Sequence, residues 1–217
     1  HEAGALLVMS VYPVSLGIVK TPGEMDADIV IGEGQCLGTP LNFGVPYLGI
    51  MATRKKCVRK MPGRIGAMTH DEDGKRGFVL TLQAREQHIR RGKAMSNICS
   101  NEALIALRSL IHMSLLGKEG FRELAIQCHS KSEYLKGKIA AFATILNDGP
   151  TFNEFAVRLP INAHSAVEKL IAQGYAAGLP LECLGVGEPN DLLVAVTEKR
   201  TREELDAFAS ALEAVCS

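Results

Sequence analysis

The chain has 217 residues, of which 47% are hydrophobic and 22% charged, so it is long and apolar enough to bury a substantial core. Its 24 Lys and Arg balance 24 Asp and Glu, and a zero formal net charge argues against a general nucleic-acid-binding protein, which normally carries a basic excess. The sequence contains no apolar run of transmembrane length and no signal peptide, so we expect no membrane association.

The cysteine pattern bears on metal binding and on compartment. The six cysteines are scattered and no two form a C-x-x-C pair, which argues against a structural zinc site. Unpaired cysteines in a chain of this size are typical of reduced, cytoplasmic proteins. We therefore expect a cytoplasmic protein without a bound metal.

The first part of the chain predicts the strands of an α/β domain. Residues 5–11 are so apolar that we expect a strand covered on both faces, as in a parallel sheet. Pro62 and Gly63 are expected to end a basic helix. Because the chain starts without Met, between an expected helix end and a strand, we interpret it as a fragment of a longer protein. The elements expected here are strands at 5–11, 27–31 and 47–52 and a basic helix at 54–61.

The second part predicts long helices followed by a small α+β domain. Apolar residues at 101–116 recur at helical spacing, and Gly117 is the expected stop. Asn162 has the position of a helix N-cap, while Thr201 and Glu204 have the spacing of a capping box. The further elements expected are helices at 121–146, 163–173 and 202–215 and strands at 155–159 and 192–196. We therefore expect two domains, 1–116 with the linking helix and 117–217.

A glycine-rich loop at 32–44 follows the strand expected at 27–31. Ligands of α/β proteins bind at the carboxyl ends of parallel strands, so this loop is a candidate binding site. It is not a G-x-G-x-x-G motif opening a helix, and it contains no lysine, Ser–His pair or carboxylate pair. A tight subunit-contact loop is the alternative interpretation.

Two basic segments, 54–64 and 85–93, precede a short polar loop at Ser96 and Asn97 that opens a helix. Free backbone N–H groups and small polar side chains at a helix start suit an anion, and the neighbouring cations favour a phosphate. Arg64, after Pro-Gly, is the residue of the first segment best placed for a specific role. Alternatively, the first segment is a solvated helix face and the second a surface helix that pairs with Glu86.

Cys128 and His129 are adjacent, but a nucleophilic pair would need an orienting third group and an exposed, activated thiol. The local sequence supplies neither, so we expect Cys128 to be a buried structural cysteine.

Motifs along essentially the whole chain resemble one family, the first (alpha) subunit of the two-subunit glycine dehydrogenase (decarboxylating), the P-protein of the glycine cleavage system. The resemblance implies the fold of type I pyridoxal-phosphate (PLP) transferases, which is aspartate-aminotransferase-like. The chain would then hold the end of the large domain, including the linking helix, and the small C-terminal α+β domain. The matching segments are 27–35, 40–44, 46–49, 59–64, 81–93, 96–99 and 196–201.

The same resemblance implies an oxidoreductase of glycine catabolism, which decarboxylates glycine on PLP and passes the aminomethyl group to the lipoyl arm of the H protein. In this family the Schiff-base lysine lies on the second (beta) subunit, and no lysine stands at the equivalent place here, residues 33–35. We therefore expect no catalytic residue in this chain, a heterotetramer in which the partner subunit holds PLP covalently, and an inactive, self-associating fragment. The alternative is a self-sufficient PLP-dependent aminotransferase-like enzyme.

In related fold-type I dimers a small polar loop crosses the interface to the neighbour's PLP phosphate. Residues 94–97 occupy that position here, so the resemblance implies that Ser96 and Asn97 are cofactor-binding residues. The family usually has Thr where this chain has Met95.

Overall fold

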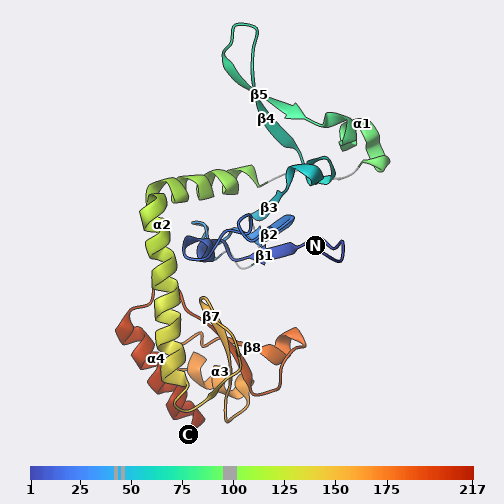
Figure 1. Cartoon of the computed structure of the whole chain (residues 1–217). Coiled ribbons are helices and arrows are strands. Elements are labelled where there is room, and N and C mark those ends of the chain that lie inside the picture. The colour runs from blue at the N-terminus through green and yellow to red at the C-terminus, as the bar shows by residue number, and fades with distance from the viewer. Residues whose placement is uncertain (42–43, 45–46, 95–101) are drawn as a thin grey trace. The chain divides into compact units, whose positions relative to one another are not determined.

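The computed structural model describes residues 1–41, 44, 47–94 and 102–217 (Figure 1). The chain forms two compact units. Unit 1 comprises residues 1–13 and 20–115, and unit 2 comprises residues 14–19 and 116–217. Among the described residues, no helix combines the length and the apolar character that crossing a bilayer would require.

A three-stranded sheet forms the centre of unit 1, in the order β1 (Val8–Val11), β2 (Ile29–Glu33) and β3 (Gly49–Thr53). Strands β1 and β2 pair in parallel with Val8 opposite Ile29, whereas β3 runs antiparallel to β2. The sheet is therefore mixed. The predicted strand at 5–11 is confirmed over residues 8–11, but its expected burial is not, because β1 is an edge strand of this chain and Leu6, Leu7 and Val8 are exposed.

The basic segment after β3 forms a 3-10 helix, η2 (Lys55–Lys60), and not the expected α-helix. The helix ends at Lys60, and its C-cap Met61 is followed by Pro62, which has no N–H to continue the helix. Gly63 follows with a φ of 79°, a left-handed conformation that glycine adopts without steric cost. The predicted Pro-Gly stop is confirmed, although the helix type is not.

An antiparallel hairpin follows, made of β4 (Ile65–His70) and β5 (Arg76–Thr81), and the sequence interpretation missed both strands. The turn between them is held by Asp71, whose Oδ1 accepts hydrogen bonds from the backbone N–H of Asp73 at 3.0 Å and of Lys75 at 2.8 Å. The chain then makes three short helical turns. These are η3 (Gln83–Arg85), α1 (Gln87–Arg90) and η4 (Arg91–Lys93).

The long segment α2 (Ala103–Ile139) is interrupted at Gly117, where φ is 62° and ψ is −174°. This conformation is not helical, so the predicted stop at Gly117 is confirmed and α2 is two helices in sequence. The second of them ends earlier than predicted. Residues 144–145 belong to a strand, β6 (Thr144–Ile145), instead of extending the helix to 146.

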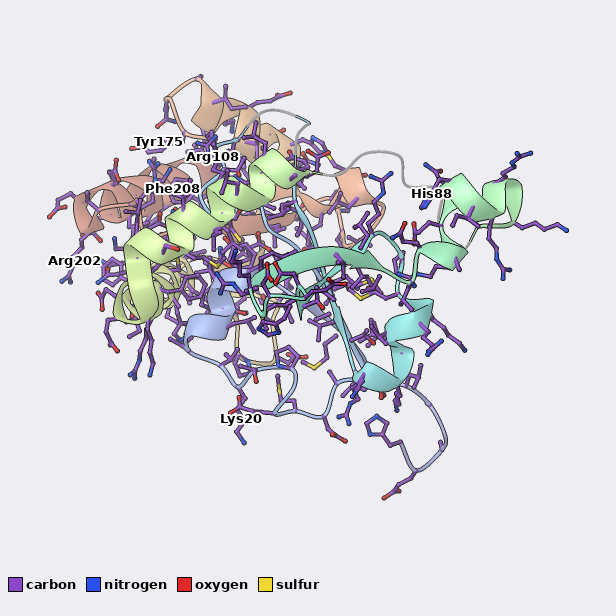
Figure 2. All side chains as sticks on the ribbon, turned by 90° about the horizontal axis from the view of Figure 1, so that it is seen from above. Lys20, His88, Arg108, Tyr175, Arg202 and Phe208 are labelled. Atoms are coloured by element: carbon purple, nitrogen blue, oxygen red, sulfur yellow. The ribbon has the colours of Figure 1, made fainter. Side chains whose placement is uncertain are left out.

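Unit 2 is an antiparallel sheet covered by helices, with the strand order β6-β7-β9-β8. Its remaining elements are β7 (Glu154–Arg158), α3 (Ala163–Ile171), β8 (Leu179–Pro180), η5 (Leu181–Leu184), β9 (Asp191–Ala195) and α4 (Arg202–Cys216). Fully buried side chains from α2, β7, α3, β9 and α4 form one core, among them Ile139, Phe155, Leu170, Leu192 and Leu212. Tyr175 and Phe208 pack at its edge with ring centroids 5.7 Å apart (Figure 2).

Both predicted helix caps in unit 2 are confirmed. The side chain of Asn162 accepts a hydrogen bond from the N–H of Ser165 at 3.1 Å, which satisfies one of the free donors at the start of α3. Thr201 and Glu204 form a complete capping box, in which each side chain accepts from the backbone N–H of the other residue.

Candidate functional site

The loop after β2 is organised by Glu33. Its Oε1 accepts hydrogen bonds from the N–H of Gln35 at 2.8 Å and of Leu48 at 3.0 Å, and the N–H of Gly34 donates to the carbonyl of Leu48 at 2.7 Å. A Cβ atom added at Gly34 would lie 3.1–3.3 Å from side-chain atoms of Leu48 and Ile50. The loop therefore closes on itself, with no amine at residues 33–35 and little room for a longer side chain at Gly34.

The same loop is tied to the first part of α2. The Nε of Arg108 donates to the carbonyl of Gly38 at 2.7 Å. Gly38 has a φ of 91°, and a Cβ atom there would lie 2.6 Å from the Cβ of His112. Glycine at position 38 thus permits both the left-handed turn and the close approach of helix and loop.

Arg85 joins two basic segments that lie far apart in the sequence. Its guanidinium is mostly buried and donates to the backbone carbonyls of Arg59 at 3.0 Å, Met61, and Gly63 at 3.0 Å. Its Nε lies 3.3 Å from Oε1 of the buried Glu86. The predicted pairing with Glu86 is confirmed for Arg85, which therefore holds structure together instead of lining a site.

Most of the other cations of these segments are exposed, although Arg54 and Lys56 pair with Asp26 and Asp28. Figure 2 shows the His88 side chain projecting from α1, and His88 is exposed. Arg64, the residue for which we expected a specific role, is exposed as well. The exposed Lys and Arg residues are Lys55, Lys56, Arg59, Lys60, Arg64, Arg90, Arg91 and Lys93.

The candidate cofactor-binding residues Ser96 and Asn97, together with Met95, lie outside the described residues. Their proposed contact with a PLP phosphate stays a prediction. The nearest described residue upstream is Ala94, which follows η4.

A buried carboxylate at the start of β2 was not anticipated. Asp28 is 1% exposed and accepts from the N–H of Leu7 at 3.1 Å, while its carboxylate oxygens lie 2.7 Å from both Lys56 Nζ and His1 Nε2. The hydrogen bond from Lys56 and that from Leu7 lower the pKa of the carboxyl group despite its burial. Asp28, Lys56 and His1 line a cavity of about 430 Å³. The sequence does hold a sign of this buried carboxylate, because Asp28 lies within an otherwise apolar strand segment.

In unit 2, the predicted structural role of Cys128 is confirmed. The thiol is buried and donates to a carboxylate oxygen of Glu198 at 3.5 Å, and burial is the main cause that raises the pKa of the thiol to about 11. The neighbouring His129 stacks on Phe152 and approaches its carbonyl at 3.3 Å. Cys128 and His129 therefore form no nucleophilic pair. Among the described residues, no group of three or more His, Cys, Asp or Glu side chains is arranged to hold a metal ion.

The fold matches that of type I PLP-dependent enzymes. A NifS-like protein from Rickettsia africae superposes with a TM-score of 0.62 at 13% identity, covering 99% of this chain and 54% of the other. At such low identity this similarity shows the fold alone. The predicted fold class is confirmed.

The chain belongs to the glycine cleavage system P-protein family, whose model matches residues 1–212. It is 54% identical over 220 residues to the probable glycine dehydrogenase (decarboxylating) subunit 1 of Citrifermentans bemidjiense, covering all of this chain and 49% of that protein. A crystal structure of glycine decarboxylase (P-protein) of the glycine cleavage system, in inhibitor-bound form, has a TM-score of 0.92 at 42% identity. It matches 99% of this chain and 49% of its own length. The chain thus spans about half the length of the curated relatives it matches.

Proposed function

We propose that this chain is part of the first subunit of a PLP-dependent glycine decarboxylase. In the proposed reaction the enzyme decarboxylates glycine and passes the aminomethyl group to the lipoyl arm of the H protein. The proposal is supported by the family match over residues 1–212 and by relatives above 50% identity that carry the name of glycine dehydrogenase (decarboxylating) subunit 1. The word "subunit" in those names supports a second subunit as the partner.

The absence of a lysine from the loop after β2 supports different roles for the two subunits. PLP enzymes hold their cofactor through a lysine amine, which forms the Schiff base. The loop after β2, where the resemblance places that lysine, holds Glu33, Gly34 and Gln35, and Glu33 is occupied by two backbone N–H groups. The described residues here do not fit covalently bound PLP, so we assign the covalent bond to the partner subunit.

The proposed role of this chain is to complete the partner's site. In this proposal Ser96 and Asn97 contact the phosphate of PLP, because the sequence predicts that they open a helix, where backbone N–H groups and small polar side chains suit an anion. Residues 1–116 are the proposed end of the large domain with its linking helix, and residues 117–217 are the proposed small C-terminal domain. Unit 2 differs from the second of these in that it also includes residues 14–19. The cytoplasm is the proposed compartment.

The test is to locate the covalent bond to PLP. The full-length first subunit is incubated with PLP alone, and together with the second subunit, then reduced with borohydride and mapped by mass spectrometry. We expect a stoichiometric adduct on one lysine of the second subunit only, and glycine–bicarbonate exchange only in the mixture. A stoichiometric adduct on a single lysine of this chain, with exchange in the absence of the second subunit, would instead establish a self-sufficient PLP enzyme.

A further inference from the structure

Three buried polar atoms lack a hydrogen-bond partner where the loop after β2 meets the first part of α2. They are Oγ1 of Thr39, Oγ of Ser109 and Nε2 of His112, and none of them has a partner within the part of the chain that the structure describes. Thr39 is 5% exposed and Ser109 is 2% exposed. In folded proteins the large majority of buried polar side-chain atoms are hydrogen-bonded to protein or to water, so three unsatisfied atoms at one contact need an explanation.

The contacts of Gly38 and Arg108 bring these three residues to one place. A Cβ atom added at Gly38 would lie 2.6 Å from the Cβ of His112 and 3.1 Å from its Nδ1, so this edge of the imidazole packs on the loop. The Nε of Arg108 donates to the carbonyl of Gly38 at 2.7 Å. Thr39 is the next residue of the loop, Ser109 is the next residue of the helix, and His112 lies one helical turn further on. All three therefore flank the same contact, which lies within unit 1.

The chemistry of the three groups suits a neutral molecule that both donates and accepts hydrogen bonds. Each hydroxyl can donate or accept, and the nitrogen of a neutral imidazole does one or the other according to its tautomer. A metal ion is disfavoured, because residues 34–41 and 103–117 contain no Asp or Glu to balance its charge. A buried anion would need a buried cation beside it, and the neighbouring Arg108 is exposed.

We propose that Thr39, Ser109 and His112 form a binding site for one internal water molecule that joins the loop after β2 to α2. A buried water typically makes about three hydrogen bonds to groups that would otherwise be unsatisfied, which matches the three atoms here. The water extends the direct bond between Arg108 and Gly38 into a network, because it connects one residue of the loop with two residues of the helix. It helps to keep the loop in its turned conformation. The site does not involve PLP, so its failure leaves the proposed glycine decarboxylase function untouched.

The experiment uses the sign of the effect when one hydroxyl is removed. Hydrogen exchange of residues 34–41 in the full-length first subunit is measured by mass spectrometry for the parent and for Thr39→Val, which keeps the shape of the side chain. Losing a hydroxyl that binds the water weakens the whole network, so we expect the loop to open about tenfold more often. A buried hydroxyl without any partner destabilises the folded state instead, so its removal would make opening rarer, and this result would overturn the proposal.

Thr39→Ser is the matched control at this position, because it keeps the hydroxyl and loses only a methyl group. We expect it to be better protected from exchange than Thr39→Val. Equal exchange in the two variants would assign the effect to side-chain packing and would overturn the water site.

Ser109→Ala tests the helix side of the site. Its control is Ser114→Ala, an exposed position of the same helix whose hydroxyl bonds to the carbonyl of Leu110, which corrects for the higher helix propensity of Ala. Relative to that control we again expect about tenfold more frequent opening of the loop. Thr39→Val combined with Ser109→Ala should have less than the sum of the separate effects, because the first change already breaks the shared network.

Fully additive effects would show that the two hydroxyls have separate partners, and they would overturn a shared water. A high-resolution crystal structure of the subunit supplies the direct observation. We expect electron density for one water within hydrogen-bond distance of Thr39, Ser109 and His112, whereas density for an ion, or no density there, would overturn the proposal.

Discussion

The pairing of Asp191 with Arg158 shows how a single carboxylate contributes to unit 2. Asp191 is 2% exposed at the start of β9, and Arg158 of β7 reaches both of its oxygens, at 2.7 and 2.9 Å. The N–H of Glu188 donates to the same carboxylate at 2.8 Å. The side-chain hydrogen bonds from Arg158 are the largest cause that lowers the pKa of Asp191, and they outweigh its burial.

The first prediction concerns Asp191→Asn. We expect the free energy of unfolding to fall by about 1–3 kcal/mol at pH 7, less than for a fully buried pair because Arg158 is half exposed and returns to water. A lowered folded pKa means that the stabilisation is complete above the ordinary pKa of 3.8, starts to be lost as the pH falls below that value, and is gone only below the lowered pKa of the folded state. Urea unfolding at pH 7 and below pH 4 should therefore show the parent and the variant converging in acid. A gap that stays constant or widens in acid would contradict this account.

The second prediction concerns Ser96, on which no contact is described. If Ser96 binds the PLP phosphate across the subunit interface, Ser96→Ala should weaken PLP retention in the assembled complex by roughly ten- to a hundredfold, since a hydrogen bond to a charged group contributes about 1.5–3 kcal/mol. Met95→Thr should leave retention unchanged or tighten it. PLP dissociation is followed by absorbance, and assembly by size-exclusion chromatography. Unchanged retention in Ser96→Ala combined with failed assembly in Asn97→Ala would make the loop an interface element instead of a cofactor contact.

At the scale of elements, α4 depends on a cap that lies entirely within four residues. Thr201 Oγ1 accepts from the N–H of Glu204 at 3.2 Å, and Glu204 Oε2 accepts from the N–H of Thr201 at 2.8 Å. The helix buries Leu205, Ala209 and Leu212 against the core of unit 2. The start of α4 therefore fixes the position of three core side chains.

The third prediction is that Thr201→Ala destabilises unit 2 by about 0.5–2 kcal/mol, the usual contribution of an N-cap side chain. Thr201→Ser keeps the hydroxyl and serves as the control, which should stay close to the parent. The measurement is thermal unfolding of unit 2 followed by helical circular dichroism. Equal losses in both variants would assign the effect to the lost methyl group and not to the cap.

Features that depend on residues close together in the sequence could be predicted from it. Features that depend on contacts between residues far apart in the sequence could not. The caps at Asn162 and Thr201 and the break at Gly117 depend on neighbouring residues, and all three are confirmed. The hairpin β4–β5 was missed because Gly66 and Gly77 interrupt the alternation of apolar side chains that marks a strand.

The same distinction holds for the candidate site. The absence of lysine at 33–35 is visible in the sequence, but the partners of Arg85 are not, because its guanidinium binds backbone carbonyls more than 20 residues away. Every residue has a backbone carbonyl, so the residue types in the sequence do not reveal which carbonyls Arg85 binds. For Asp28, the partner Lys56 lies 28 positions along the chain and was interpreted as part of a solvated face.

At the scale of the whole molecule, the first part of α2 carries an apolar face that the described residues leave uncovered. Leu104, Leu107, Ile111 and Leu115 recur at spacings of three and four residues and are between 51% and 83% exposed. Leu6 and Leu7, which precede β1, and Val8 of β1 are exposed as well. Such apolar surface favours association with another chain.

The fourth prediction is that the 217-residue chain forms dimers or larger species by light scattering. Leu107→Lys combined with Ile111→Lys should shift it towards monomers, because two charges would then be buried in any contact through this face. Ile171→Lys, at an exposed position of α3 in unit 2, is the control and should leave the association unchanged. A parent chain that stays monomeric at high concentration would show that this face needs no partner.

Because unit 2 includes residues 14–19, its folding depends on a segment that is synthesised long before the rest of the unit. They include most of η1 (Pro13–Gly17), and Gly17 lies so close to the first turns beyond Gly117 that an added Cβ atom would be 2.8 Å from the Cβ of Ala125. The backbone consequently passes between the two units three times. On the ribosome, η1 emerges about a hundred residues before its packing partner, and unit 2 then has to recruit a segment already embedded in the sequence of unit 1. A polypeptide starting at residue 116 would lack this piece, so unit 2 cannot be separated intact by a single cut.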